Sequence, residues 1–140
     1  MKILVPMDGS TFSVKACRWV VGLTKSLRRP PQICLVNADE PLSKSVAIHI
    51  GATESARYHK DNAEYALKKG RSLLRRADLK WTEEARIGYP ATVILEIAQR
   101  YKADFIVMGS HGRTPLKSLV LGSVTSKVIA GASKPVVVVR

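Results

Sequence analysis

Short apolar runs alternate with segments of helical periodicity along the whole of this 140-residue chain. The runs are rich in valine, isoleucine and leucine, which is typical of strands that are covered on both faces. They span residues 2–6, 32–38, 81–87, 104–109 and 135–139. This alternation predicts one α/β domain over residues 1–140, in which helices wrap a doubly wound parallel sheet of five strands.

The four intervening segments each carry a helix signal. The first helix is expected to start after Ser10, whose hydroxyl can cap free backbone N–H groups. The second is expected from about residue 55 to 77, because its apolar and charged residues fall on opposite faces. Pro90 suits the first turn of the third helix, and Gly131 suits the end of the fourth. Residues 40–55 fit neither period, so we expect a lid or a tolerated surface insertion there.

The composition is strongly basic, with 23 Lys and Arg against 11 Asp and Glu and a formal net charge of +12. Such a charge attracts anionic partners. Part of it forms one stripe on the second helix, through Lys60, Lys68, Arg71 and Arg75. A solvated helix face is the simplest interpretation of this stripe. We do not expect nucleic acid as a partner, because the stripe lacks interleaved aromatic residues for base stacking. An acidic protein is as good a candidate for the partner of this stripe as a nucleic acid is.

No apolar run approaches the eighteen or so residues that a membrane span requires. The N-terminus also lacks the apolar stretch of a secretory signal. These features predict a cytoplasmic protein without a membrane partner. Cys17 and Cys34 are expected to be reduced thiols that face the core, since cytosolic thiol pools keep cysteines reduced.

Two of the predicted strands end in residues that suit a ligand site. Asp8 and Gly9 follow the first strand, and "GSHGR" starts at the end of the fourth. In doubly wound sheets, ligands bind at the carboxyl ends of the strands where the winding direction reverses. Gly109 and Gly112 would let backbone N–H groups approach a ligand, and Gly122 would open the last helix, whose N-terminus attracts anions. The pattern therefore predicts a phosphate site, with Asp8 placed to accept from ribose hydroxyls.

The spacing Gly109-x2-Gly112-x9-Gly122-Ser123 is similar to the nucleotide-binding signature of the universal stress protein family, in its ATP-binding branch. The opening "KILVPMDGS" and the closing "KPVVVVR" also resemble that family, so the likeness spans the whole chain. It implies a flavodoxin-like fold with strand order 3-2-1-4-5 and four helices. It also implies ATP with Mg2+ as the ligand and a homodimer that pairs residues 136–139 antiparallel across its interface, which would cover an apolar sheet edge.

The resemblance carries over a set of nucleotide-binding positions, with an adenosine part and a phosphate part. The adenosine part comprises Pro6, Met7, Asp8, Ala38 and Met108. The phosphate part comprises Gly109, His111, Gly112, Arg113, Gly122, Ser123, Val124 and Thr125, with the Ser123 and Thr125 hydroxyls as donors. Two positions depart from the family pattern, namely Asn37, where many relatives have histidine, and Pro115, where a small residue is commoner.

The residues favour a binding module over an enzyme. The chain has no phosphate-loop lysine of the Walker type and no carboxylate in the signature placed to activate water. Asp8, Ser10 and His111 offer the residue types of a hydrolytic triad, but no nucleophile-elbow pattern accompanies them. We therefore assign no catalytic residue and no metal-binding side chain. The preferred hypothesis is a dimeric, ATP-dependent sensor or regulator in stress response. The alternatives are a slow ATPase or phosphotransfer protein, and a nucleotide-free dimeric adaptor.

Overall fold

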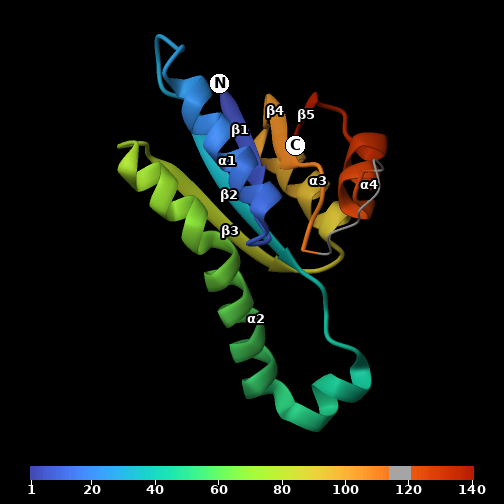
Figure 1. The fold of residues 1–140 in the computed structure, drawn as a ribbon. Coiled ribbons are helices and arrows are strands. Elements are labelled where there is room, and N and C mark those ends of the chain that lie inside the picture. Colours follow the sequence, from blue (N-terminus) through green and yellow to red (C-terminus); the bar gives the residue numbers. More distant parts are fainter. Residues whose placement is uncertain (114–120) are drawn as a thin grey trace.

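The computed structural model describes residues 1–113 and 121–140, and shows a parallel sheet with helices on both faces (Figure 1). Pro115 lies outside the described residues. The elements are β1 (Lys2–Pro6), α1 (Thr11–Thr24), β2 (Gln32–Asp39), α2 (Lys44–Arg76), β3 (Trp81–Ile87), α3 (Pro90–Tyr101), β4 (Phe105–Gly109), α4 (Ser123–Gly131) and β5 (Val136–Val139). The strand order is β3-β2-β1-β4-β5, which confirms the predicted flavodoxin-like topology.

Each face of the sheet has its own hydrophobic core, because alternate residues of a strand point to opposite sides. On one face, Ile3 and Leu35 pack with α1 and α2 through residues such as Val20 and Leu67. On the other face, Leu4 packs with α3 and α4 in a second cluster of buried residues. Cys17 belongs to the first cluster and Cys34 to the second, and both are buried free thiols as predicted.

The ends of the helices follow the signals in the sequence. Ser10 caps α1, since its Oγ accepts a hydrogen bond from the backbone N of Ser13 at 3.1 Å. Pro90 opens α3 and Gly131 ends α4, as expected. Among the described residues, no helix has the length and apolar character needed to cross a membrane.

The second helix is longer than predicted. It begins at Lys44 and the backbone of Gly51 breaks it with φ 80° and ψ 167°, so its second piece starts close to the predicted residue 55 and only the short first piece was missed. Ser43 caps the first piece by accepting from the backbone N of Val46 at 3.4 Å. The kink changes the direction of the helix, so no single apolar period runs through it, and most side chains of residues 44–58 remain exposed. This part of α2 projects away from the sheet (Figure 1).

Candidate functional site

A cavity of about 620 Å³ lies at the carboxyl ends of β1 and β4, where the winding direction of the sheet reverses. We call it the crevice. Twelve of the thirteen residues predicted from the sequence line it. They are Pro6, Met7, Asp8, Ala38, Met108, Gly109, Gly112, Arg113, Gly122, Ser123, Val124 and Thr125. The parallel sheet brings these distant segments together because β1 and β4 are neighbours in it.

The turn after β1 is held by local hydrogen bonds. The backbone N of Ser10 donates to Asp8 Oδ1 at 2.9 Å, and Gly9 takes the positive φ of 81° that this tight turn requires. Arg113 Nε donates to the backbone O of Asp8 at 2.8 Å, which ties the loop after β4 to the end of β1. The other carboxylate oxygen, Asp8 Oδ2, lies 3.0 Å from where a Cβ on Gly112 would be. Glycine at 112 therefore leaves this carboxylate accessible in the crevice.

The end of β4 is packed closely against α1. A Cβ on Gly109 would lie only 2.6 Å from the backbone C of Phe12, so no larger residue fits without a shift. The backbone N of Gly122 donates to the backbone O of Ser110 at 2.8 Å, which seats the start of α4 on the residue after β4. Gly122 is the N-cap residue of α4 and supplies no side-chain cap. Among the described residues no side chain caps α4, so its first backbone N–H groups can serve a ligand.

Thr125 differs from its predicted role. Its hydroxyl was expected to donate to a phosphate, but it is buried and donates to the backbone O of Gly109 at 2.9 Å. The hydroxyl proton is used within the protein, so Thr125 can offer a phosphate only its backbone N–H. The exposed Ser123 remains available as a side-chain donor.

His111 does not line the crevice, although it belongs to the signature. Its ring packs against Phe12 with the ring centroids 5.1 Å apart, and its Nδ1 lies 3.0 Å from Ser110 Oγ. The side chain thus packs against α1. Its assignment to the phosphates finds no support in the lining of the crevice.

Residues of the β2–α2 connection complete the crevice, and the sequence signature did not indicate them. Pro41, Leu42 and Ser43 line it, together with Tyr58 of α2. The remaining lining residues that were not predicted are Ser13, Val36, Asp39, Glu40, Pro90 and Ile94. The only sequence feature that indicated this side of the crevice was the unusual length of the 40–55 segment, for which a lid or a surface insertion was expected.

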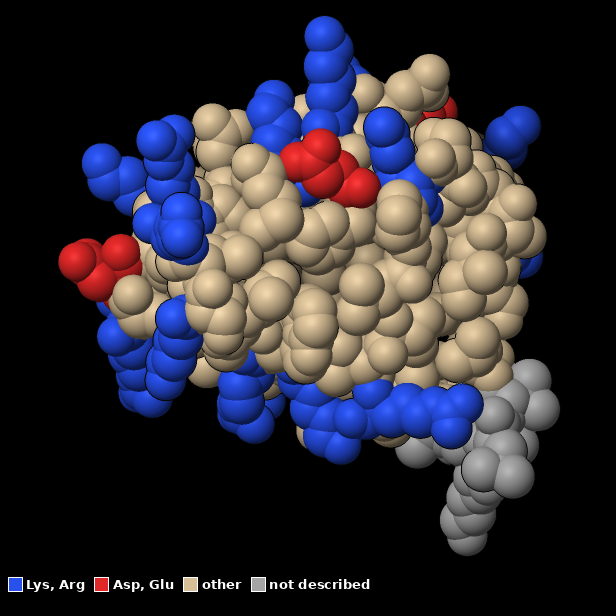
Figure 2. Space-filling model, turned by 90° about the horizontal axis from the view of Figure 1, so that it is seen from above, with Lys and Arg blue, Asp and Glu red and all other residues tan. Residues whose placement is uncertain are grey.

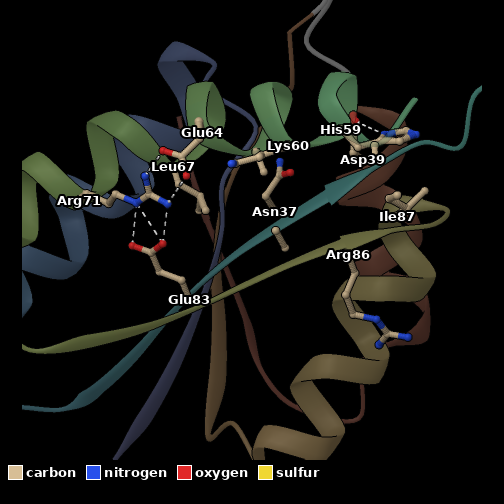
Figure 3. Close-up of a pocket in the computed structure, with 13 residues that line it drawn as sticks. Asn37, Asp39, His59, Lys60, Glu64, Leu67, Arg71, Glu83, Arg86 and Ile87 are labelled. Carbon is tan, nitrogen blue, oxygen red and sulfur yellow. Dashed lines mark hydrogen bonds and ion pairs between the residues drawn. The ribbon is translucent and has the colours of Figure 1, made fainter. Parts of the chain in front are cut away.

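A second cavity of about 450 Å³ lies between α2 and strands β2 and β3 (Figure 3). Asn37 lies on its floor, with Nδ2 donating to the backbone O of Met7 at 3.0 Å and with Oδ1 unpartnered among the described residues. Asp39 lines both cavities, and its Oδ2 accepts from His59 Nδ1 at 2.6 Å and from Asn62 Nδ2 at 2.9 Å. These contacts fasten α2 to the end of β2, beside the crevice.

One end of the second cavity is closed by a charged cluster (Figure 3). Arg71 donates to both Glu83 oxygens, with Nη2 2.7 Å from Oε2, and also to Glu64. The hydrogen bonds from Arg71 hold the pKa of Glu83 below its ordinary value. Part of the predicted basic stripe is therefore paired rather than free. No group of three or more His, Cys, Asp or Glu that could hold a metal ion occurs in residues 1–113 and 121–140.

The fold and the crevice define a flavodoxin-like α/β protein with a candidate anion-binding site at its switch point. The Universal stress protein family model matches residues 1–140, so the chain belongs to that family. Universal stress protein MJ0531 of Methanocaldococcus jannaschii is 34% identical over 140 residues, which cover 99% of this chain and 81% of the relative.

Solved structures share the fold as well. The structure of hypothetical protein MJ0577, also from Methanocaldococcus jannaschii, superposes with a TM-score of 0.85 at 29% identity and covers 99% of this chain and 94% of its own. A universal stress protein in complex with cAMP superposes with a TM-score of 0.73 at 22% identity, over 100% of this chain and 97% of that one. This last likeness supports the fold alone.

Proposed function

We propose that the crevice binds an adenine nucleotide, with ATP and Mg2+ as the ligand, and that the protein is a nucleotide-dependent regulator in stress response. The observation that carries this proposal is the meeting of the uncapped N-terminus of α4 with the loop after β4 inside one cavity. Backbone N–H groups at a helix N-terminus, aided by the helix dipole, favour phosphate groups.

The phosphate end of the proposed site is built from backbone rather than from side chains. Ser123, Val124 and Thr125 line the crevice in the first turn of α4, where N–H groups have no partner within the helix. Arg113 adds a positive charge at the rim, and Gly112 leaves space beside Asp8. These groups fit an anion that approaches along the end of β4.

The adenosine end is more apolar. Met7 and Met108 are buried at the strand ends, and Ala38 follows from β2 on the same side. Asp8 Oδ2 can accept from ribose hydroxyls, because only Oδ1 is engaged by Ser10. The volume of about 620 Å³ lies within the range of small-molecule sites.

Magnesium is proposed to reach the site with the phosphates. Mg2+ is commonly bound through phosphate oxygens, water and one or two carboxylates. Asp8, Asp39 and Glu40 are the carboxylates that line the crevice, and Asp8 is the one beside Gly112, in the loop proposed to hold the phosphates. When bound, the ion would neutralise part of the phosphate charge.

Binding rather than hydrolysis is the preferred activity, and no catalytic residue is assigned. The loop after β4 offers donors and a cation, and its sequence lacks a Walker lysine. A slow ATPase or phosphotransfer protein remains the enzyme alternative, and a nucleotide-free adaptor the structural one.

We also propose a homodimer through β5. This strand is at the edge of the sheet, its four valines are only partly buried, and its outer side pairs with no strand among the described residues. Antiparallel pairing of residues 136–139 with a second copy would cover this edge. Light scattering after gel filtration gives the mass directly, and a monomer at micromolar concentration would refute the dimer.

Calorimetric titration with ATP and Mg2+ tests the nucleotide proposal. Gly122→Val should abolish binding, because a Cβ at 122 already lies 3.2 Å from His111 Cα and further branches would disturb the start of α4. Gly22→Val is the matched control, because a Cβ at 22 meets nothing within 4 Å, and it should bind normally. Absence of binding by the wild type would favour the adaptor, whereas sustained phosphate release by wild type and not by Gly122→Val would favour the ATPase.

A further inference from the structure

The end of the molecule opposite the crevice is basic. In a parallel sheet every helix-to-strand connection ends at the amino edge of the strands, so four connections meet there. Together with the last turn of α2, they carry eight exposed cations. We call this surface the basic face, and it comprises Lys25, Arg28, Arg29, Arg75, Arg76, Lys80, Lys102 and Lys134. Figure 2 shows Lys and Arg side chains spread around this end of the molecule, with few acidic ones.

These cations are not neutralised by the protein itself. Among the described residues, none of the eight makes a hydrogen bond or an ion pair with a carboxylate. The connections contain two acidic residues, Asp78 and Asp104. Asp104 already accepts from the backbone N of Lys2 at 2.7 Å and lies 4.0 Å from the terminal amine.

Several arginines elsewhere are paired with carboxylates. Arg71 is paired with Glu64 and Glu83, and Arg86 Nη1 lies 3.1 Å from Glu96 Oε2. Arg100 pairs with Glu84. The eight cations of the basic face have no such partner among the described residues, so their positive charge is available to a partner.

We propose that the basic face docks on an anionic membrane surface. The cations do not follow a line, as they would along the backbone of a nucleic acid. Arg28 follows α1 and Arg76 ends α2 on one side of the sheet, whereas Lys102 follows α3 and Lys134 follows α4 on the other side. They therefore span the thickness of the domain in two dimensions, which matches the charge of a bilayer surface.

The shape of this end agrees with a planar partner. The two cavities described above lie at the carboxyl edge of the sheet and beneath α2, and Figure 2 shows no deep hollow in the basic face. Met1, 51% exposed, adds an apolar side chain at the same end. Docking in this orientation directs the crevice away from the membrane, so a nucleotide could enter or leave. The proposal stands apart from nucleotide binding, and it departs from the sequence-based expectation of no membrane partner, which rested on the lack of a spanning segment.

Co-sedimentation with vesicles tests the proposal. The probes are vesicles of phosphatidylcholine with about one third phosphatidylserine, and vesicles of phosphatidylcholine alone. We expect the 140-residue protein to bind the anionic vesicles only. It should be released as salt rises from about 0.1 M towards 1 M, where the Debye length falls from ~10 Å to ~3 Å.

Two variants of equal charge separate a docking face from the effect of net charge. The face variant combines Arg28→Gln, Arg29→Gln, Arg76→Gln and Lys134→Gln. The control variant removes four exposed lysines elsewhere, by Lys44→Gln, Lys60→Gln, Lys68→Gln and Lys127→Gln. We expect the partition coefficient to fall about a hundredfold in the face variant and less than about tenfold in the control. A basic residue adds to the binding free energy only when it lies close to the membrane surface.

Three outcomes would overturn the proposal. The wild type could fail to bind anionic vesicles, or both variants could lose binding equally, which would show attraction by net charge alone. The wild type could also bind duplex DNA or RNA more tightly than vesicles, with the same loss in the face variant, which would identify a polynucleotide as the partner. Equal thermal melting of the three proteins excludes unfolding as the cause of any loss.

Discussion

The hydroxyl of Thr125 donates a hydrogen bond to the backbone O of Gly109 across 16 positions of sequence, at 2.9 Å and in a buried setting. This contact joins the first turn of α4 to the last residue of β4. The two elements that form the phosphate end of the proposed site are therefore fixed to each other directly, although the loop between them is long.

Thr125→Val should loosen this junction. Valine has the shape of threonine but leaves the Gly109 carbonyl without its buried donor, which costs about 1–3 kcal/mol in the free energy of unfolding. We expect this loss in urea denaturation, with weaker ATP binding in calorimetry. Thr125→Ser keeps the hydroxyl and should retain both properties in large part. A valine variant as stable as the wild type would show that the contact contributes nothing.

Gly109→Ala should destabilise the fold through the neighbouring helix. The new Cβ would lie 2.6 Å from the backbone C of Phe12 and 2.8 Å from its O, and backbone atoms cannot turn aside as a side chain can. We expect a loss of about 1–3 kcal/mol in the free energy of unfolding. Gly22→Ala, in α1, is the matched control, since a Cβ there meets nothing within 4 Å and helix propensity improves by up to about 1 kcal/mol. Equal effects of the two changes would contradict this account.

The contact between Arg71 and Glu83 should make the stability of the fold depend on pH in the acidic range. Hydrogen bonds from Arg71 hold the pKa of Glu83 below its ordinary value of 4.5. The stabilisation is therefore complete above that value, and it is lost as the pH falls through the lowered pKa of the folded state. A double-mutant cycle with Glu83→Gln and Arg71→Gln should give a favourable coupling at about pH 7 that weakens as the medium is made more acidic than the ordinary pKa of glutamate. A coupling that does not change with pH would contradict the charged contact.

The two cysteines should resist modification while the protein is folded. Burial raises the pKa of Cys17 to about 11 and also raises that of Cys34, and only the thiolate reacts rapidly. A disulfide reagent at about pH 8 should therefore titrate no thiol in the native protein within minutes, and both thiols in denaturant. Rapid reaction of the native protein with one equivalent would show that a helix opens more readily than its packing suggests.

Local patterns in the sequence predicted most of the architecture. Strands β1 to β5 were predicted within about one residue of their bounds, because each is an apolar run between clear breaks. The caps at Ser10 and Pro90 and the end at Gly131 also depend on neighbouring residues alone. The strand order was not contained in these patterns. It came from resemblance to a family, and the structure confirms it.

The part of the crevice formed by the glycine signature was predicted from the spacing of its residues. The part formed by residues far away in the sequence was not predicted. The glycine signature located the strand-four side of the cavity, since glycine marks close approaches of backbone. Leu42 and Tyr58 belong to no recognisable sequence motif. They reach the crevice because of the path of the chain around the first piece of α2 and the kink at Gly51.

The sequence by itself determined the number and kind of elements, the glycine turns and the excess of positive charge, because these depend on residue type and spacing. Tertiary structure decided that the Thr125 hydroxyl bonds to Gly109, that His111 packs against Phe12, and that eight exposed cations share one end of the sheet. A side chain's partner depends on which distant segment folds against it, and the periodicity of the sequence does not specify that segment.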